Sequence, residues 1–225
     1  MMQCGPIRFR VDAKNQAAAR PFKHVVVPRY TTFKMPSEIS EPSIQDIYAA
    51  LILDAQRNNL IFDDILTALE AGYTPLLLTE RTEHVDYFGK RLKGFVRNVI
   101  VLRGGMGKKQ RKAVADKIAS IPDDEERVII ATGRFIGEGF DDARLDALFL
   151  VMPISWRGTL QQYAGRLHRL HNNKHVVRIY DYVYILEPML KRMYDKRLKG
   201  YKTMGYKVWD KEDMCNKQFE FMLNL

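Results

Sequence analysis

The sequence predicts an α/β fold in which helices cover both faces of a mostly parallel sheet. From residue 74 onward, short apolar segments alternate with longer segments whose apolar residues recur at helical spacing. Parallel strands joined by crossover helices produce this alternation. The segments expected to form strands are 74–79, 96–105, 126–132, 145–152 and 175–183. The segments expected to form helices are 82–92, 108–121, 159–170 and 187–204, the last of them strongly basic.

The chain before residue 74 is expected to supply a linker and two helices. Residues 24–30 form a candidate strand, and the segment 35–43 contains the proline and serine typical of a linker. Ser43, followed by Asp46, resembles a helix N-cap with an acidic first turn, and Gly72 is a typical helix stop. We therefore divide the chain into a linker or extended segment, 1–45, an α/β domain, 46–185, with a helical lead-in, 46–72, and a basic helix and tail, 186–225.

Composition narrows the functional class. The chain of 225 residues is 46% hydrophobic and 28% charged, which indicates a globular protein. Its net charge of +9 favours polyanionic partners such as nucleic acids and nucleotides. Cys4 and Cys215 lie far apart in no metal-binding spacing, so a disulfide scaffold and a zinc site are not expected. With neither a signal-peptide core nor a membrane span in the sequence, we expect a cytoplasmic protein.

The loops that follow the predicted strands are the places to look for a ligand site. In open parallel sheets, ligands bind at the carboxyl ends of the strands. These loops are rich in glycine, arginine and acidic residues, as a phosphate-binding or nucleic-acid-binding edge requires. They cover residues 79–82, 103–108, 132–141 and 153–158.

Two segments resemble a phosphate loop and a magnesium-binding acidic pair but do not match those motifs. The segment 104–111 suggests a phosphate loop, but that pattern needs glycine in place of Leu102 and a hydroxyl residue in place of Lys109. The acidic run 123–126 precedes a strand, whereas a magnesium-binding acidic pair would follow one, so we interpret it as a solvated turn. We expect no metal site in this chain.

The predicted helix 159–170 combines a polar stripe with an apolar one. Gln162, Arg166 and Arg169 fall at positions i, i+4 and i+7, which place them on one face of a helix. Tyr163, Leu167 and Leu170 repeat the spacing one residue on and predict a buried stripe. A solvated surface helix is the alternative. Arginines also stabilise the charge of a transferring phosphoryl group through bidentate hydrogen bonds.

The segment 131–169 resembles the C-terminal RecA-like domain of superfamily 2 helicases, most of all restriction-enzyme-type and DEAD/DEAH-box proteins. The family motif Gln-x-x-Gly-Arg-x-x-Arg is matched by Gln162, Gly165, Arg166 and Arg169. The preceding motif, a threonine and then Arg-Gly-x-Asp, is matched by residues at three positions, Thr132, Gly139 and Asp141, with Glu138 in place of the arginine. Segments 76–88 and 102–111 resemble two earlier motifs, with Arg103 in place of a histidine. The resemblance covers residues 60–185.

The resemblance implies a RecA-like three-layer sandwich and a role as the C-terminal motor domain of an ATP-dependent helicase or translocase. ATP and Mg²⁺ would be held mainly by a separate N-terminal RecA-like domain, so this chain alone would hydrolyse ATP poorly. The residues implied in catalysis are Gln162, Arg166 and Arg169, and those implied in nucleotide contact are Gly139, Asp141 and Gly165. Those expected at nucleic acid, with DNA favoured over RNA, are Thr79, Arg81, Gly104, Gly105, Lys108, Thr132 and Gly133.

We expect the strand-end loops and the arginines to share one cleft. Glycine is unfavourable inside a helix, so we expect a close neighbour, either backbone or ligand, to explain Gly165. Other points are left open by the sequence. Phe135 and Trp156 could stack on bases or pack in the core, and the basic segment 191–202 could follow phosphates or form a solvated face. The rival functions are a non-catalytic basic nucleic-acid-binding module and the sugar-nucleotide-binding half of a transferase.

Overall fold

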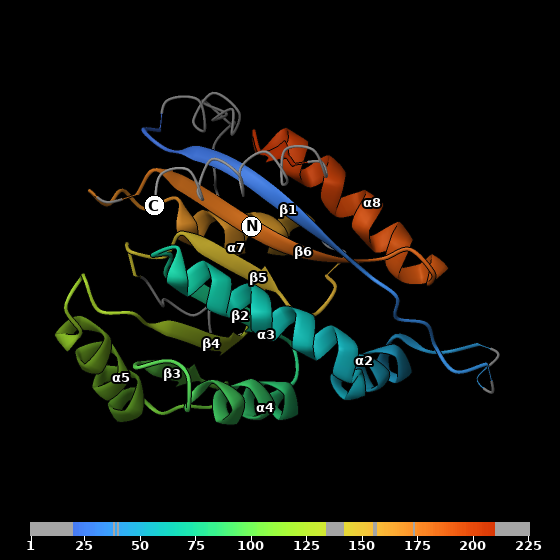
Figure 1. Ribbon diagram of the computed structural model, residues 1–225, viewed down its shortest axis with the longest axis horizontal. Helices are drawn as coiled ribbons and strands as arrows, with labels where there is room; N and C mark the ends of the chain where they lie inside the picture. The colour runs from blue at the N-terminus through green and yellow to red at the C-terminus, as the bar shows by residue number, and fades with distance from the viewer. Residues whose placement is uncertain are drawn as a thin grey trace, which may run out of the picture.

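The computed structural model describes residues 20–37, 39, 41–133, 142–154, 157–172 and 174–209. Seven parallel strands form one sheet in the order β3-β4-β2-β5-β6-β1-β7 (Figure 1). The strands are β1 (Lys23–Thr31), β2 (Pro75–Thr79), β3 (Val99–Leu102), β4 (Val128–Thr132), β5 (Ala147–Leu150), β6 (Val176–Tyr184) and β7 (Lys207–Val208). The helices are α2 (Ile44–Leu53), α3 (Ala55–Glu70), α4 (Thr82–Leu92), α5 (Lys108–Ser120), α7 (Arg157–Leu167) and α8 (Pro188–Thr203).

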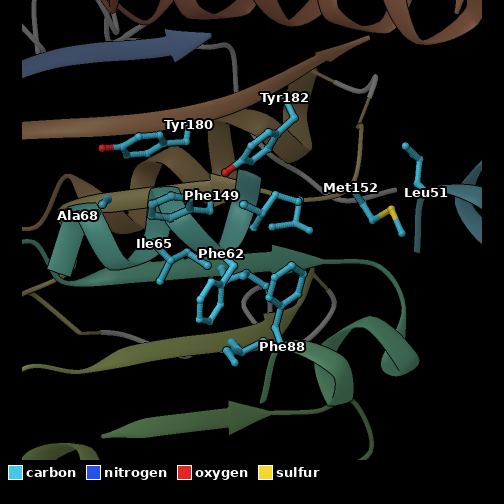
Figure 2. Packing of buried hydrophobic residues seen from close by; sticks show 14 of the residues in the cluster. Leu51, Phe62, Ile65, Ala68, Phe88, Phe149, Met152, Tyr180 and Tyr182 are labelled. Atoms are coloured by element: carbon cyan, nitrogen blue, oxygen red, sulfur yellow. The ribbon is translucent and has the colours of Figure 1, made fainter. Parts of the chain in front are cut away.

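Helices cover both faces of the sheet and enclose two hydrophobic cores. In β2, Leu77 points into one core while its neighbours Leu76 and Leu78 point into the other, as the pleat of a strand requires. Helices α3 and α4 close the first core, where Phe62, Ile65 and Phe88 approach the sheet residue Phe149 (Figure 2). Helices α5 and α7 close the second core. The result is the predicted three-layer α/β sandwich.

The local signals in the sequence are confirmed. Every segment from residue 74 to 204 that was predicted as a strand or helix contains one of that type. Ser43 caps α2 in a capping box, in which its hydroxyl accepts from the Asp46 N–H while the Asp46 carboxylate accepts from the Ser43 N–H. Gly72 adopts a φ of 77° just after α3, a conformation that favours glycine.

The predicted linker and tail both contribute strands to the sheet. The candidate strand at 24–30 is β1, which pairs in parallel with β6 along its whole length, so residues 23–31 belong to the α/β domain. The short strand β7, which the sequence did not predict, pairs with β1. Helix α8 is anchored to the same sheet, because the buried Arg197 guanidinium donates two hydrogen bonds to the Asp181 carboxylate. The proposed domain limits at 45 and 185 therefore cut through one folded unit.

Helix α7 is shorter than its apolar stripe suggested. It ends at Leu167, so Arg169 lies in the following turn and does not share a helical face with Gln162. Tyr163 and Leu167 are buried as predicted, but Leu170 is 67% exposed because the chain has left the helix by that point.

Among the described residues, no helix is long and apolar enough to cross a membrane.

Candidate functional site

The residues singled out in the sequence lie at two opposite edges of the sheet. Helix α7 follows β5 and runs back antiparallel to the strands, and its 11 residues span about 15 Å. Arg166 and Arg169 therefore lie at the edge where the strands begin, here called the amino edge. The loops after β2, β3 and β4 lie at the other edge, the carboxyl edge. The expectation of one shared cleft is wrong, because a crossover helix carries its last residues to the opposite edge from its first.

Along α7 and the turn that follows it, Gln162 and Arg169 are exposed and Arg166 is half-buried. Arg166 forms no ion pair with any residue in the described part of the chain. A Cβ added at Gly165 would meet no atom within 4 Å among the described residues. No backbone in the described part of the chain thus approaches Gly165, and the ligand that we gave as the other explanation stays a prediction.

The turn that carries Arg169 is held from inside by a buried lysine. Lys174, which is 4% exposed, donates from Nζ to the carbonyl oxygens of Leu167 and Arg169, both at 2.9 Å. It donates a third hydrogen bond to the Ala143 carbonyl at 2.8 Å. One ammonium group thus ties the end of α7 to the segment that leads into β5.

A second cationic clamp holds the same segment on its other side. The Arg144 guanidinium, anchored to the Asp142 carboxylate, donates to the carbonyls of Ile118 and Ile121 at the end of α5, both at 2.9 Å. It also forms an ion pair with Asp123, so the acidic run 123–126 does more than line a solvated turn. Gly139 and Asp141, the implied nucleotide contacts, lie outside the described residues, as do Phe135 and Trp156.

At the carboxyl edge, Thr79 faces inward. It is 1% exposed, and its hydroxyl lies 3.3 Å from Nδ1 of His84. The other ring nitrogen, Nε2, lies 3.1 Å from the Asn58 side-chain oxygen. Burial, and then the charge of Arg57, lower the pKa of His84 to about 2, so the ring is neutral. Thr79 therefore donates to Nδ1, and its hydroxyl is used inside the protein rather than offered to a phosphate.

Gly133, at the end of β4, is hemmed in by two side chains. A Cβ at this position would overlap the Tyr163 hydroxyl and the Glu80 carboxylate. The same two groups bond to each other, with Tyr163 Oη donating to Glu80 Oε1 at 3.4 Å. Burial raises the pKa of Glu80, an effect that the Tyr163 hydrogen bond opposes. Glycine is needed here for packing between β4, α7 and the loop after β2.

Three of the predicted nucleic-acid residues do face the carboxyl edge with free space around them. Gly104 and Gly105 form the turn after β3, where Gly105 has a φ of 84°, and Lys108 is exposed at the start of α5. The Thr132 hydroxyl, close to Gly104, is buried and has no hydrogen-bond partner among the described residues. Loop 103–108 thus combines a glycine turn with an exposed cation, and the buried Thr132 hydroxyl at the end of β4 lies beside it.

Arg81 borders a cleft of about 580 Å³ at the same edge. Its guanidinium is hydrogen-bonded to Gln45 and lies 5.8 Å from the centre of the Tyr48 ring. Further lining residues come from α2, the loops after β2 and β5, α7 and α8: Ile44, Glu80, Ile154, Thr159, Met189 and Met193.

The loop that leads from β5 to α7 is pinned by residues that the sequence did not single out. Three helices each contribute one side chain, and each side chain holds one backbone carbonyl of residues 151–154. Arg57 donates to Val151, Tyr48 donates to Pro153 at 2.7 Å, and Arg197 donates to Ile154 at 2.7 Å. No local pattern predicts these contacts, because they join segments up to 105 positions apart.

Comparison with known proteins identifies the type of fold. No protein-family model and no curated protein sequence matches the chain. Its structure is similar to that of the C-terminal part of the Fun30 ATPase domain, at 14% identity and a TM-score of 0.55 over 64% of this chain and 46% of the other. It is also similar to T4 UvsW, at 15% identity and a TM-score of 0.63 over 84% of this chain and 41% of the other. The fold is RecA-like.

This likeness confirms the predicted resemblance at the level of fold. The RecA-like chain spans less than half the length of either structure that it matches. Within the described residues, no group of three or more histidine, cysteine, aspartate or glutamate side chains could hold a metal ion. The cationic clamps around Lys174 and Arg144 are the functional candidates that sequence reasoning missed, because the carbonyls that they hold cannot be identified from the sequence.

Proposed function

We propose that this chain is the C-terminal motor domain of an ATP-dependent nucleic-acid helicase or translocase. The observation that carries the proposal is the arginine pair at the end of α7. Arg166 and Arg169 lie at the surface, on a turn whose backbone is fixed by Lys174. A cation aimed at a phosphate works best when it does not have to reorganise during the reaction. The RecA-like fold, found here and in part of an ATPase domain, supports the same role.

In this proposal the amino edge faces a nucleotide held mainly by a separate N-terminal RecA-like domain. Mg²⁺ bound with the ATP would neutralise phosphate charge there, since this chain offers no ligand set of its own among the described residues. Arg166 and Arg169 would donate hydrogen bonds to the γ-phosphate, and Gln162 would orient the attacking water or the phosphate. Gly165, Gly139 and Asp141 are the further proposed nucleotide contacts, and the open space beside Gly165 suits such an approach.

The carboxyl edge is proposed to bind the nucleic-acid backbone. Gly104, Gly105 and Lys108 would contact phosphates through N–H groups and charge, and Thr132, whose hydroxyl is buried, would support this loop from within. Arg81 would act from the rim of the neighbouring cleft. Thr79 and Gly133 would shape this edge from within rather than touch the ligand. The net charge of +9 favours a polyanion, and DNA remains our preferred class.

The test removes the arginines from the protein that contains both RecA-like domains. Arg166→Ala and Arg169→Ala should each lower nucleic-acid-stimulated ATP hydrolysis by about 10³-fold or more, the range that an arginine finger contributes. Nucleic-acid affinity should stay near that of the wild type. Arg192→Ala, on the exposed face of α8, is the matched control and should leave hydrolysis unchanged. Full hydrolysis by both arginine variants would refute the proposal.

A second candidate, a non-catalytic basic binding module, is favoured by the exposed face of α8. The tyrosines of this helix, Tyr194 and Tyr201, are buried, so its surface consists largely of the cations Lys191, Arg192, Lys196, Lys199 and Lys202. This function predicts salt-sensitive binding that is weakened by neutralising these lysines. It also predicts that Arg166→Ala has no effect beyond that of losing one charge.

A further inference from the structure

We propose that Lys174 is a positioning residue for the arginine pair, locking the turn after α7 against the segment that leads into β5. The inference rests on the proposed function, because it assigns Lys174 a part in the same nucleotide site. It adds a residue that no motif includes and that touches no ligand itself.

The contacts of Lys174 are unusually complete for a lysine. Its ammonium has three N–H groups, and each finds a backbone carbonyl, at Ala143, Leu167 and Arg169. Burial lowers the pKa of Lys174 to about 8, so the group remains mostly charged at neutral pH. The Phe22 ring lies 5.5 Å from Nζ and covers it on one side. Every donor is therefore used, and none of them is used by solvent.

The three carbonyls are those whose placement matters for the site. Leu167 ends α7, where the free carbonyls carry partial negative charge that a cation stabilises. Arg169 is itself one of the pair, and Arg166 lies just before the clamped end of the helix. Ala143 belongs to the segment that leads into β5, so the same ammonium joins that segment to the arginine turn.

Lys174 is itself rigidly placed. It lies two residues before β6, and the neighbouring His175 carbonyl accepts a hydrogen bond from the Lys23 N–H at the start of β1. Lys174 thus fixes the arginine turn relative to the edge of the sheet. The other support of that turn that we identify is lateral, a 2.8 Å contact between Nε2 of His168 and the Tyr206 hydroxyl.

The experiment replaces Lys174 by methionine, which keeps the length of the side chain and removes all three donors. In the two-domain protein, kcat for stimulated ATP hydrolysis should fall about 10- to 100-fold, the cost of a displaced catalytic group. KM for ATP and nucleic-acid affinity should stay within about twofold of wild type. A purely structural lysine would instead lower the active fraction, and binding would fall in proportion. Lys90→Met, at an exposed lysine of α4 to which no role is assigned, is the control and should change nothing.

Hydrogen exchange on this chain gives a readout that does not depend on activity. In Lys174→Met, amides 167–172 should exchange faster while those of β2 and β5 keep their protection. If that variant does not fold, Lys174→Gln, which keeps two donors, should give a kcat between those of wild type and the arginine variants.

The outcomes separate the two proposals. Wild-type kcat in both Lys174 variants, together with inactive Arg166→Ala, overturns the positioning role and leaves the motor function intact. Unchanged exchange at 167–172 in Lys174→Met overturns it as well. Wild-type activity in Arg166→Ala and Arg169→Ala overturns the motor function itself.

Discussion

At the carboxyl edge of the sheet, polar side chains bond to other side chains of the protein, as Thr79 does to His84 and Tyr163 does to Glu80. At the amino edge, by contrast, the backbone carbonyls of Leu167 and Arg169 accept hydrogen bonds from the buried Lys174, while the Arg169 side chain is exposed and that of Arg166 is half-buried. The first arrangement joins strands and helices to each other. The second arrangement fixes the backbone that carries charged side chains. This difference shows that motif residues at the carboxyl edge take part in packing the fold, and it is the reason that we propose a nucleotide contact for the arginines at the amino edge.

The largest effect on stability should come from the buried ion pair of the carboxyl edge. Asp181 is 1% exposed and accepts hydrogen bonds from Arg197 and Tyr201. Asp181→Asn would leave the Arg197 charge buried without a counter-charge, which costs about 3–5 kcal/mol. Chemical denaturation should show this loss. A loss below about 1 kcal/mol would mean that α8 does not depend on the pair.

Gly133→Ala should destabilise the chain by about 2–3 kcal/mol, because the new Cβ overlaps Tyr163 and Glu80. Removing the obstructing hydroxyl with Tyr163→Phe in the same chain should recover part of that loss. The free energies of unfolding of the single and double variants test this directly. Additive losses would show that the glycine is required for another reason.

Asp146, at the amino edge, predicts how stability depends on pH. Burial raises its pKa to about 7, although the Thr74 N–H donates to its carboxylate at 2.7 Å. The folded chain therefore holds this proton more tightly than the unfolded chain, and stability should fall as pH rises from about 4 to 7. Asp146→Asn should flatten that fall and gain roughly 2 kcal/mol at pH 8. Parallel melting curves of the variant and the wild type would refute this.

Thr79→Val should have the smallest effect, about 1–2 kcal/mol, since it leaves Nδ1 of the buried His84 without a donor. Thr79→Ser keeps the hydroxyl and should lie closer to wild type. Nucleic-acid affinity should change little in either variant. A selective loss of binding in Thr79→Val would return this hydroxyl to the list of ligand contacts.

Local features of the fold could be predicted because they depend on neighbours in sequence. The Ser43–Asp46 capping box and the turn at Gly72 are examples. The place of β1 in the sheet could not be predicted, because its partner strand begins about 150 positions later. The Lys174 clamp was missed for a different reason, since its partners are backbone carbonyls and a lone lysine in a sequence does not show which carbonyls surround it. The separation of the two edges, however, follows from helix direction alone.

The central claim is that ATP is met at the amino edge and nucleic acid at the carboxyl edge. The most direct measurement compares Arg166→Ala with Lys108→Ala in the protein that contains both RecA-like domains, scoring ATP hydrolysis and single-stranded DNA binding together. We predict that Arg166→Ala abolishes hydrolysis and keeps binding. Lys108→Ala should weaken binding and its salt dependence while keeping basal hydrolysis. Equal losses of both activities in both variants would contradict the claim.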